Sequence, residues 1–268
     1  MLNKNNLKVW LKSVSLIGAL LFANNLFAET AEEKGLRIAT ERKAADKGWG
    51  DSEAETQMIL RNAQGEESVR EIRTRALEVD GDGDKGLTIF DQPRDVAGTA
   101  FLNHSHINEP DDQWLYLPAL KRVKRIASRN KSGPFMGSEF AYEDLASFEV
   151  AKYTYKYLRD EVVNGENCWV LESIPTDRYS GYTKQIVWID QKHHRAQKVE
   201  FYDRKHALLK TLTMYDYRLY LDKYWRAHKL SMVNHQTGKS TDLITAETKF
   251  RVGLEARDFE QNALRRAR

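Results

Sequence analysis

The chain has 268 residues, and its 42 Lys and Arg exceed its 39 Asp and Glu by a formal charge of +3. The first 28 residues hold three Lys and no acidic residue, so the rest of the chain, with 39 residues of each sign, is neutral. This balance argues against a general binder of nucleic acids or other polyanions.

The one cysteine, Cys168, cannot form an internal disulfide, and we interpret it as a small buried apolar residue beside Trp169.

The N-terminal segment, residues 1–28, has the layout of a secretory signal peptide. A basic start is followed by an apolar run from Val14 to Phe22, and the segment closes on Ala28. The run is shorter than the stretch of about 20 apolar residues that a membrane-spanning helix needs. We therefore expect cleavage near Ala28 and export to the periplasm. Because no linker is recognisable in the remaining chain, residues 29–268 are expected to form a single domain.

A helix and a hairpin are predicted next. Residues 29–48 carry a weak apolar stripe that includes Leu36 and Ile38, with charged residues between, which indicates a helix. From Trp49 onward the apolar period becomes two. Two alternating stretches flank the polar turn AQGEE, and this pattern is typical of a β-hairpin.

An acidic loop, DGDGDKG, follows the hairpin. Asp80, Asp82 and Asp84 have the spacing of the first three ligands of an EF-hand, and Asp91 falls at the twelfth loop position. Lys85, however, stands where that loop requires Gly, and the twelfth position lacks the bidentate Glu. We interpret the segment as a turn between two strands rather than a calcium site.

Two histidines offer the next candidate site. His104 and His106 have i, i+2 spacing, which would place them on one face of a strand and could supply two ligands of a metal site. No further ligands in a known spacing accompany them. The chain also has no P-loop, no dinucleotide fingerprint and no GxSxG motif. We therefore expect neither a metal nor a cofactor, and binding rather than catalysis.

The stretch DQWLYLPALKRVKRI begins as an aromatic strand and ends as a basic one. Side chains alternate along a strand, so Trp114 and Tyr116 share one face while Leu115 and Leu117 share the other. One pair can line a cavity while the other packs under a helix. After Pro118 the chain turns, and the cations that follow point to both faces of the next strand, which suits a solvated edge or rim.

A glycine- and aromatic-rich segment, GPFMGSEFAYEDL, comes after this basic stretch. We interpret it as a loop that closes over the end of the sheet. Its carboxylates, Glu143 and Asp144, could offset the preceding cations, among them Arg122 and Arg125. Those cations could alternatively meet a lipid headgroup or an acidic patch on a partner.

The second half of the chain predicts an antiparallel meander. Asn164-Gly165 is a strong signal for a two-residue hairpin turn, and several aromatic and β-branched stretches follow. In ALLKTLTMYDYRLY, Leu212 and Met214 lie on one face and Leu209 on the other, so both faces are apolar. Packing in a sandwich, against helices or around a ligand would each explain this. A sheet of about ten strands must curl, split or close. The stretch EARDFEQNALRR ends the chain as a short helix.

Three segments, LTIFDQPRDVAGTAFL, WLYLPALKRVKRI and FMGSEFAYEDL, resemble the exported outer membrane lipoprotein-sorting protein family. This family is related in fold to the periplasmic lipoprotein carrier LolA and its receptor LolB. The resemblance covers essentially the whole mature chain and is most specific between residues 87 and 145. It implies a mainly β protein: a strongly curved antiparallel sheet, an unclosed barrel, with a few helices plugging the concave side. It also implies a lipid or acyl-chain ligand and, as often in this family, a partner transporter of the resistance-nodulation-division (RND) type.

The residues that carry the family pattern are the candidate site. The candidates for ligand contact are Trp114, Tyr116, Arg122, Arg125, Phe135, Phe140 and Tyr142. The candidates for a shared structural corner are Pro118, Gly137, Ser138, Glu143 and Asp144. We expect the segment from Trp114 to Asp144 to form part of the cavity mouth, with an inward Trp114 in contact with the acyl chain.

The sequence thus predicts a periplasmic carrier or chaperone that binds a lipid or lipoprotein acyl chain in an apolar cavity. Two alternatives stand beside it: an exported hydrolase acting on a lipid or glycan, and a non-catalytic periplasmic scaffold. A hydrolase could use Glu143 and Asp144 as acid and base. Adjacent side chains diverge on a strand and on a helix, whereas glycosidase carboxylates flank one bond, so this pairing is disfavoured.

Overall fold

The computed structural model describes residues 28–266, so the predicted signal peptide lies outside the described residues except for Ala28. Thirteen strands form one antiparallel sheet. In chain order they are β1 (Asp51–Arg61), β2 (Glu67–Leu77), β3 (Lys85–Gln92), β4 (Ala100–His104), β5 (Asp112–Leu117), β6 (Arg122–Ile126), β7 (Tyr153–Val163), β8 (Glu166–Pro175), β9 (Tyr182–Asp190), β10 (Ala196–Asp203), β11 (Leu208–Tyr220), β12 (Tyr224–Asn234) and β13 (Ser240–Phe250).

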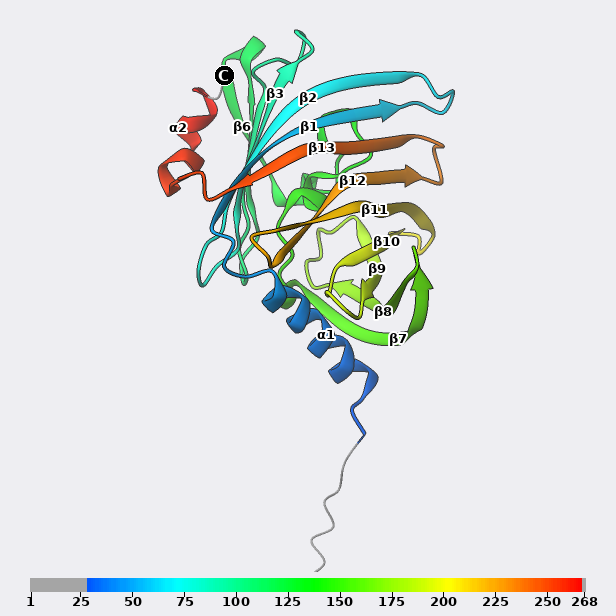
Figure 1. Cartoon of the computed structure of the whole chain (residues 1–268). Coiled ribbons are helices and arrows are strands. Elements are labelled where there is room, and N and C mark those ends of the chain that lie inside the picture. Colours follow the sequence, from blue (N-terminus) through cyan, green and yellow to red (C-terminus); the bar gives the residue numbers. More distant parts are fainter. Residues whose placement is uncertain (1–27, 267–268) are drawn as a thin grey trace, which may run out of the picture.

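The chain lays down this sheet in two halves. β1 to β6 run outward from the middle to one edge, and β7 to β13 return from the opposite edge until β13 pairs with β1. The sheet is strongly curved, and β6 and β7 are its two ends and do not pair with each other (Figure 1). The predicted mainly β, unclosed barrel is therefore confirmed.

The turns between neighbouring strands follow local sequence signals. Asn164 and Gly165 both have positive φ, 52° and 81°, and they join β7 to β8 as the only residues between the two strands. Positive φ at both positions is what a type I′ hairpin turn requires. The hairpin predicted at Asn164-Gly165 is thus present.

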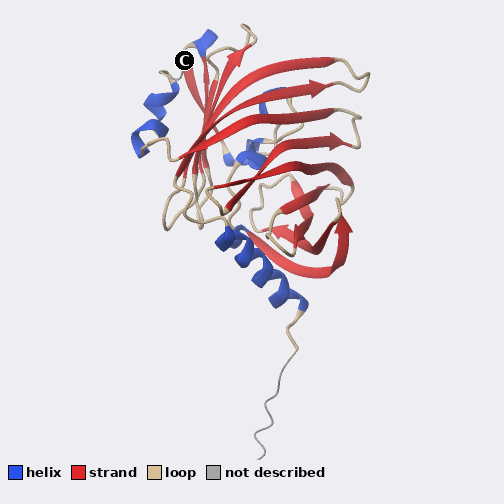
Figure 2. Cartoon of the chain, in the orientation of Figure 1, coloured by secondary structure: helices blue, strands red, loops and turns tan. Residues whose placement is uncertain are grey.

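A single segment, residues 127–152, connects the two edges and crosses the concave side of the sheet (Figure 2). It contains four 3-10 turns: η2 (Ser128–Asn130), η3 (Phe135–Gly137), η4 (Tyr142–Leu145) and η5 (Val150–Lys152). We call it the crossing segment. The concave side is therefore filled mostly by short turns, to which one α-helix is added.

That helix is α1 (Ala31–Ala45), close to the predicted helix over residues 29–48. Thr30 caps its N-terminus, and Glu33 completes a reciprocal capping box. Its apolar side, with Ile38 and Ala39 fully buried, packs on β7 and faces the concave side. None of the helices in the described part of the chain is long and apolar enough to cross a membrane.

The C-terminal residues cover the convex face of the first half. The predicted single helix consists of two short turns, η6 (Ala256–Phe259) and α2 (Gln261–Leu264). A further 3-10 turn, η1 (Pro118–Leu120), lies between β5 and β6. Phe259 and Leu264 are fully buried against β3, β4 and β5. Both faces of much of the sheet are thus covered, which explains why its strands are apolar on both sides.

Candidate functional site

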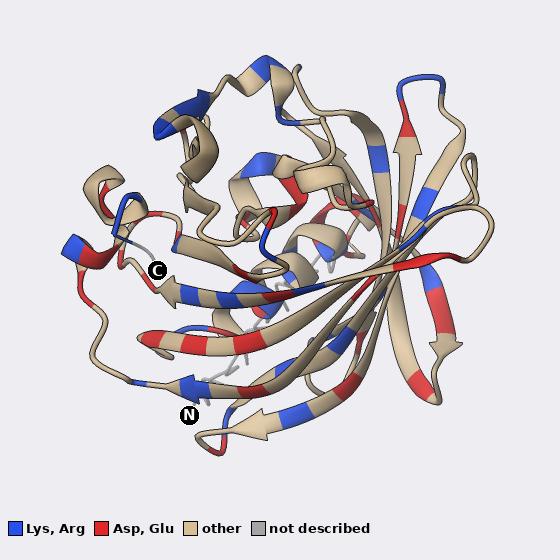
Figure 3. Ribbon diagram, turned by 90° about the horizontal axis from the view of Figure 1, so that it is seen from above, with Lys and Arg blue, Asp and Glu red and all other residues tan. Residues whose placement is uncertain are grey.

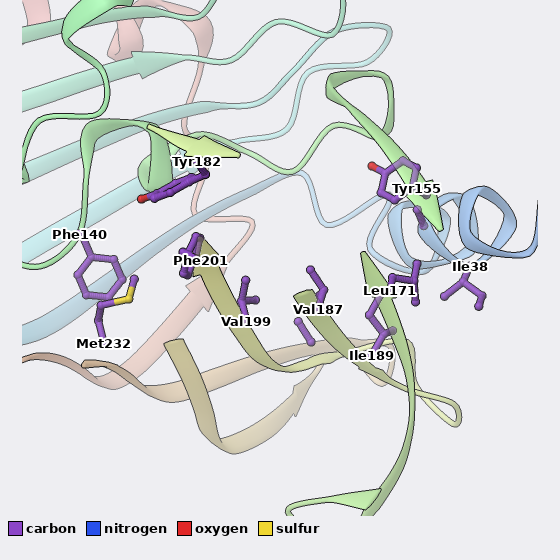
Figure 4. Packing of buried hydrophobic residues seen from close by; sticks show 12 residues of the cluster. Ile38, Phe140, Tyr155, Leu171, Tyr182, Val187, Ile189, Val199, Phe201 and Met232 are labelled. Carbon is purple, nitrogen blue, oxygen red and sulfur yellow. The ribbon is translucent and has the colours of Figure 1, made fainter. Parts of the chain in front are cut away.

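A cavity of about 690 Å³ lies between the concave face of the second half, α1 and the crossing segment. Its floor comes from β8 to β11, where inward-pointing side chains alternate with outward ones. The apolar floor residues are Leu171, Val187, Ile189, Val199, Phe201, Leu212 and Met214. Figure 4 shows several of these side chains in a row on adjacent strands, with Ile38 of α1 and Tyr155 of β7 at one end. The cavity therefore has a continuous apolar wall.

Two loops and their ion pairs frame the cavity. The β4–β5 loop contributes Asp111, which pairs with Lys152 of η5. The β8–β9 loop contributes Asp177, whose carboxylate lies 2.6 Å from the Lys131 ammonium. These pairs fasten the crossing segment to loops from both halves of the sheet, so they fix the position of the cavity rim.

Glu143 lines the cavity and is held from the β8–β9 loop. Its two carboxylate oxygens accept hydrogen bonds from the Ser180 hydroxyl and the Gly181 backbone N–H, each at 2.8 Å. Burial raises the pKa of Glu143, although these hydrogen bonds act in the opposite direction. A Cβ at Gly181 would lie 2.9 Å from a Glu143 oxygen and 2.7 Å from Ser132 Cβ, so a residue without a side chain is required there.

Asp144 is held from the sheet itself. Its carboxylate accepts hydrogen bonds from the Lys210 ammonium at 2.6 Å, the Tyr182 hydroxyl at 2.8 Å and the Ala141 N–H at 2.7 Å. Lys210 also donates to the Glu139 carbonyl at 2.8 Å, and both charged side chains are about 5% exposed or less. This buried pair ties the crossing segment to β11.

Both carboxylates are therefore engaged in structural contacts. Glu143 bonds the β8–β9 loop and Asp144 bonds β11, so the two adjacent side chains diverge as expected. Of the cations in KRVKRIASRNK that they were expected to offset, Lys131 acts on the charge of Glu143. Arg122 and Arg125 do not: they lie on β6, and Arg125 pairs with Asp112 instead.

The structure places Trp114 and Tyr116 on the convex face. Both belong to the cluster that Phe259 and α2 cover, and the Trp114 ring meets the His104 ring edge-on at 5.1 Å between centroids. Leu115 lies on the opposite face, as alternation predicted. The expected inward Trp114 is thus corrected: the C-terminal turns, not a ligand, cover its face of β5.

Phe135 and Tyr142 belong to the core of the first half. Their rings pack with Phe90 and Phe101 at centroid distances of 5.2–5.8 Å, on the concave side but outside the cavity lining. Phe140 packs near Met232 in the other half (Figure 4). Phe135, Tyr142 and Phe140 thus anchor the crossing segment to both halves of the sheet.

The remaining pattern residues form turns. Pro118 begins η1, and its ring approaches Gly98. Gly137 and Ser138 end η3, where the Ser138 hydroxyl donates to the Phe135 carbonyl at 2.7 Å. Both border a second, more open hollow, which Phe140 also lines.

The basic stretch is an exposed sheet edge. Lys121, Arg122, Lys124 and Arg125 are all exposed on or next to β6, whose outer side carries no paired strand. None of them lines the cavity. Elsewhere along the strands, acidic and basic residues are interspersed (Figure 3). The predicted solvated edge is therefore present, but it lies away from the cavity mouth. Of the predicted Trp114-to-Asp144 segment, Lys131, Glu143 and Asp144 line the cavity.

The acidic loop before β3 is fastened to the β4–β5 loop by Asp82 and His106. Asp82 lies 2.7 Å from His106 Nδ1 and accepts the Ile107 N–H at 2.9 Å, and the His106 contact lowers its pKa to about 2. Gly83 packs so closely against Ser105 that a Cβ at position 83 would lie 2.6 Å from the Ser105 carbonyl. His104 instead contacts the Phe259 carbonyl. No group of three potential metal ligands occurs among residues 28–266.

Sequence reasoning missed most of the cavity wall. Leu212 and Met214 were recognised as sharing one face of a strand, and both line the cavity. Arg42 of α1 also lines it, but nothing in the local pattern of α1 separates this cation from its neighbours. Cys168 is fully buried beside Trp188 on the convex side, and burial raises its pKa to about 11.

An open, curved antiparallel sheet is the fold that the resemblance to LolA-like proteins implies, and comparison with solved structures supports this fold. An outer membrane lipoprotein-sorting protein domain from Vibrio parahaemolyticus is 69% identical, with a TM-score of 0.86, over 87% of this chain and 99% of that one. A DUF1329 family protein from Desulfovibrio piger is 28% identical, with a TM-score of 0.82, over 88% and 99%.

A LolA superfamily protein from Nitrosomonas europaea, 21% identical over 85% of this chain and 98% of that one, has a TM-score of 0.68 and shows the shared fold. A family model described as "Uncharacterized protein" matches residues 82–266, and no curated protein matches. The chain belongs to the outer membrane lipoprotein-sorting protein family, and it shares its fold with the LolA superfamily protein.

Proposed function

We propose that the protein is a periplasmic carrier or chaperone that holds the acyl chain of a lipid or lipoprotein in the cavity between β8–β11, α1 and the crossing segment. The observation that carries the proposal is the apolar floor of this cavity, which continues over four adjacent strands. Its volume of about 690 Å³ falls within the range of roughly 300–1,000 Å³ typical of small-molecule sites.

Burial of the ligand's acyl chain would supply the binding energy. At roughly 25 cal/mol per Å², removing about 300 Å² of acyl surface from water is worth about 7 kcal/mol before the costs of association. No covalent step is needed for this function. Glu143 and Asp144, the carboxylates that a hydrolase would use, are engaged by Ser180, Gly181 and Lys210, and this supports binding over catalysis.

The test is the binding of a fluorescent fatty acid to delipidated protein, together with native mass spectrometry of lipid that co-purifies. Val187→Phe fills the cavity floor and should weaken probe binding at least tenfold, about 1.4 kcal/mol. Val162→Phe is the matched control, because Val162 is exposed on β7 outside the cavity. Wild-type protein that binds no acyl probe would refute the carrier function.

The location and the partner belong to the same proposal. The layout of residues 1–28 supports export, and intact-mass analysis of the periplasmic fraction should find a mature form that begins near Glu29 rather than Met1.

The exposed cations of β6 offer a surface for an acidic patch on a partner, such as an RND-type transporter. Replacing Arg122 and Lys124 by Gln should then weaken ligand transfer at low salt and have less effect at high salt, because exposed charges are screened.

A further inference from the structure

Arg42 is a cation inside the cavity that has no anionic partner. It lies in the last turn of α1 and lines the cavity, with its guanidinium carbon 4.3 Å from the centre of the Phe148 ring. Its neighbours on the helix are paired: Arg37 with Glu29 and Glu41, and Lys43 with Glu149. Within residues 28–266, no carboxylate forms an ion pair or hydrogen bond with Arg42.

The surroundings of Arg42 do not neutralise its charge. Tyr217, Tyr155 and Tyr153 act on its charge, and the hydroxyls of Tyr155 and Tyr217 donate to backbone carbonyls elsewhere. The one acid that acts on Arg42 among these groups, Asp46, accepts a hydrogen bond of 2.6 Å from Arg226. Burial lowers the pKa of Arg42, but a guanidinium stays protonated in proteins. A charge desolvated in this way is costly unless an anion joins it.

The other cations at the cavity are either paired or exposed. Lys131 pairs with Asp177 and Lys152 with Asp111, both at the rim. Arg178 is exposed on the β8–β9 loop. Arg42 therefore marks one place in the cavity where an incoming anion would find an unpaired positive charge.

We propose that Arg42 binds the anionic headgroup of an amphiphile whose hydrocarbon chain lies along the apolar floor. The shared chemistry of the headgroup is a carboxylate or a phosphate monoester, because the planar guanidinium presents parallel N–H donors that match either group. The guanidinium carbon lies over the Phe148 ring, and this cation–π contact uses none of the N–H donors of Arg42. This inference rests on the carrier function proposed above and adds to it a preference for anionic ligands.

The test compares three probes that share one chain: a fluorescent fatty acid, its methyl ester and the corresponding lysophosphatidic acid. We expect wild-type protein to bind one or both acids about tenfold or more tightly than the ester, the size of a charge-assisted pair. The acid that binds more tightly identifies the headgroup. Arg42→Gln should abolish the preference and leave the affinity for the ester unchanged. Arg42→Lys, which keeps the charge without the planar fork, should retain part of it.

Arg37→Gln is the matched control, because Arg37 lies on the same helix, is paired and does not line the cavity. It should bind all three probes as wild type does. Arg42→Gln should melt at or above the wild-type temperature, because it removes an unpaired, half-buried charge. Equal wild-type binding of acid and ester, or an unchanged preference in Arg42→Gln, would overturn the Arg42 anchor and leave the carrier function standing. A wild type that binds none of the probes would overturn the carrier function itself.

Discussion

Individual polar side chains determine how the crossing segment sits in the sheet. Lys210 reaches from β11 to both Asp144 and the Glu139 carbonyl, and Glu143 receives two hydrogen bonds from the β8–β9 loop. Because these groups are buried, each depends on its partner, and the family pattern at Glu143 and Asp144 is accounted for by these contacts.

The first prediction concerns the buried ion pair. Lys210→Met should lower the free energy of unfolding by about 3–5 kcal/mol, because it leaves the Asp144 carboxylate buried without its cation. Chemical denaturation measures the loss. Arg218→Met is the control, since its pair with Asp216 is exposed and should change stability by about 0.5 kcal/mol or less. A loss below about 1 kcal/mol in Lys210→Met would mean that water reaches and solvates Asp144.

The second prediction concerns Asp84, whose pKa burial raises to about 6, although Lys43 lies 3.9 Å away. The folded pKa is thus above the unfolded one. As the pH rises from about 4 to about 6, the unfolded chain releases this proton first, so the contribution of Asp84 to stability is lost over that window. Asp84→Asn keeps the acceptor for the Val79 N–H and should stabilise the protein by about 1–3 kcal/mol at pH 7.5.

At pH 4 the same variant should be nearly as stable as wild type, because the carboxyl is then largely protonated in the folded state. Urea denaturation at both pH values gives the comparison. A destabilised Asp84→Asn at pH 7.5 would contradict the prediction and show that attraction to Lys43 outweighs the cost of burial.

Among the elements, α1 packs closely against its neighbour β7. A Cβ on Gly35 would lie 3.0 Å from the backbone nitrogens of Lys156 and Tyr157, so the helix rests directly on the β7 backbone. Glycine in a helix interior normally weakens the helix by up to about 1 kcal/mol relative to alanine. Here close packing against the strand supplies the reason for it, and the same approach places Ala39 and Arg42 at the cavity.

The third prediction follows from that contact. Gly35→Ala should destabilise the protein by about 1–3 kcal/mol despite its better helix propensity, because the added methyl group pushes α1 away from β7. It should also weaken acyl-probe binding, since α1 forms one wall of the cavity. Ala45→Gly, at the exposed end of the same helix, is a control for propensity alone. A stabilised Gly35→Ala would show that helix and strand separate at little cost.

Across the whole molecule, two half-sheets are held together by the β1–β13 pairing and by the crossing segment. Phe135 and Tyr142 of that segment pack on the first half, while Asp144 and Phe140 contact the second. The cavity has walls from α1, the crossing segment and the second half, so it exists only when these parts are assembled.

The fourth prediction uses this dependence. An acyl ligand that binds the folded protein alone should raise its stability by about 2.7 kcal/mol at a free concentration 100 times its Kd. Thermal melts at increasing concentrations of fatty acid measure the shift. Val187→Phe should show a much smaller shift at the same concentrations. An equal shift in both proteins would indicate that the ligand binds elsewhere.

Local patterns in the sequence determined much of the fold. The capping box at Thr30, the Asn164-Gly165 turn and the period-two alternation act over a few residues, so they predict helix, hairpin and strands wherever they occur. Alternation also showed that Trp114 and Leu115 face opposite ways. It cannot tell which face becomes the interior.

Only the tertiary structure decided that. Trp114 faces outward because residues near the C-terminus cover it, and Asp144 finds its cation 66 positions along the chain. Arg42 is left without an anion because the acids near it bond other cations. Burial and pairing of this kind depend on contacts between distant segments, and a pattern read over neighbouring residues contains no information about them.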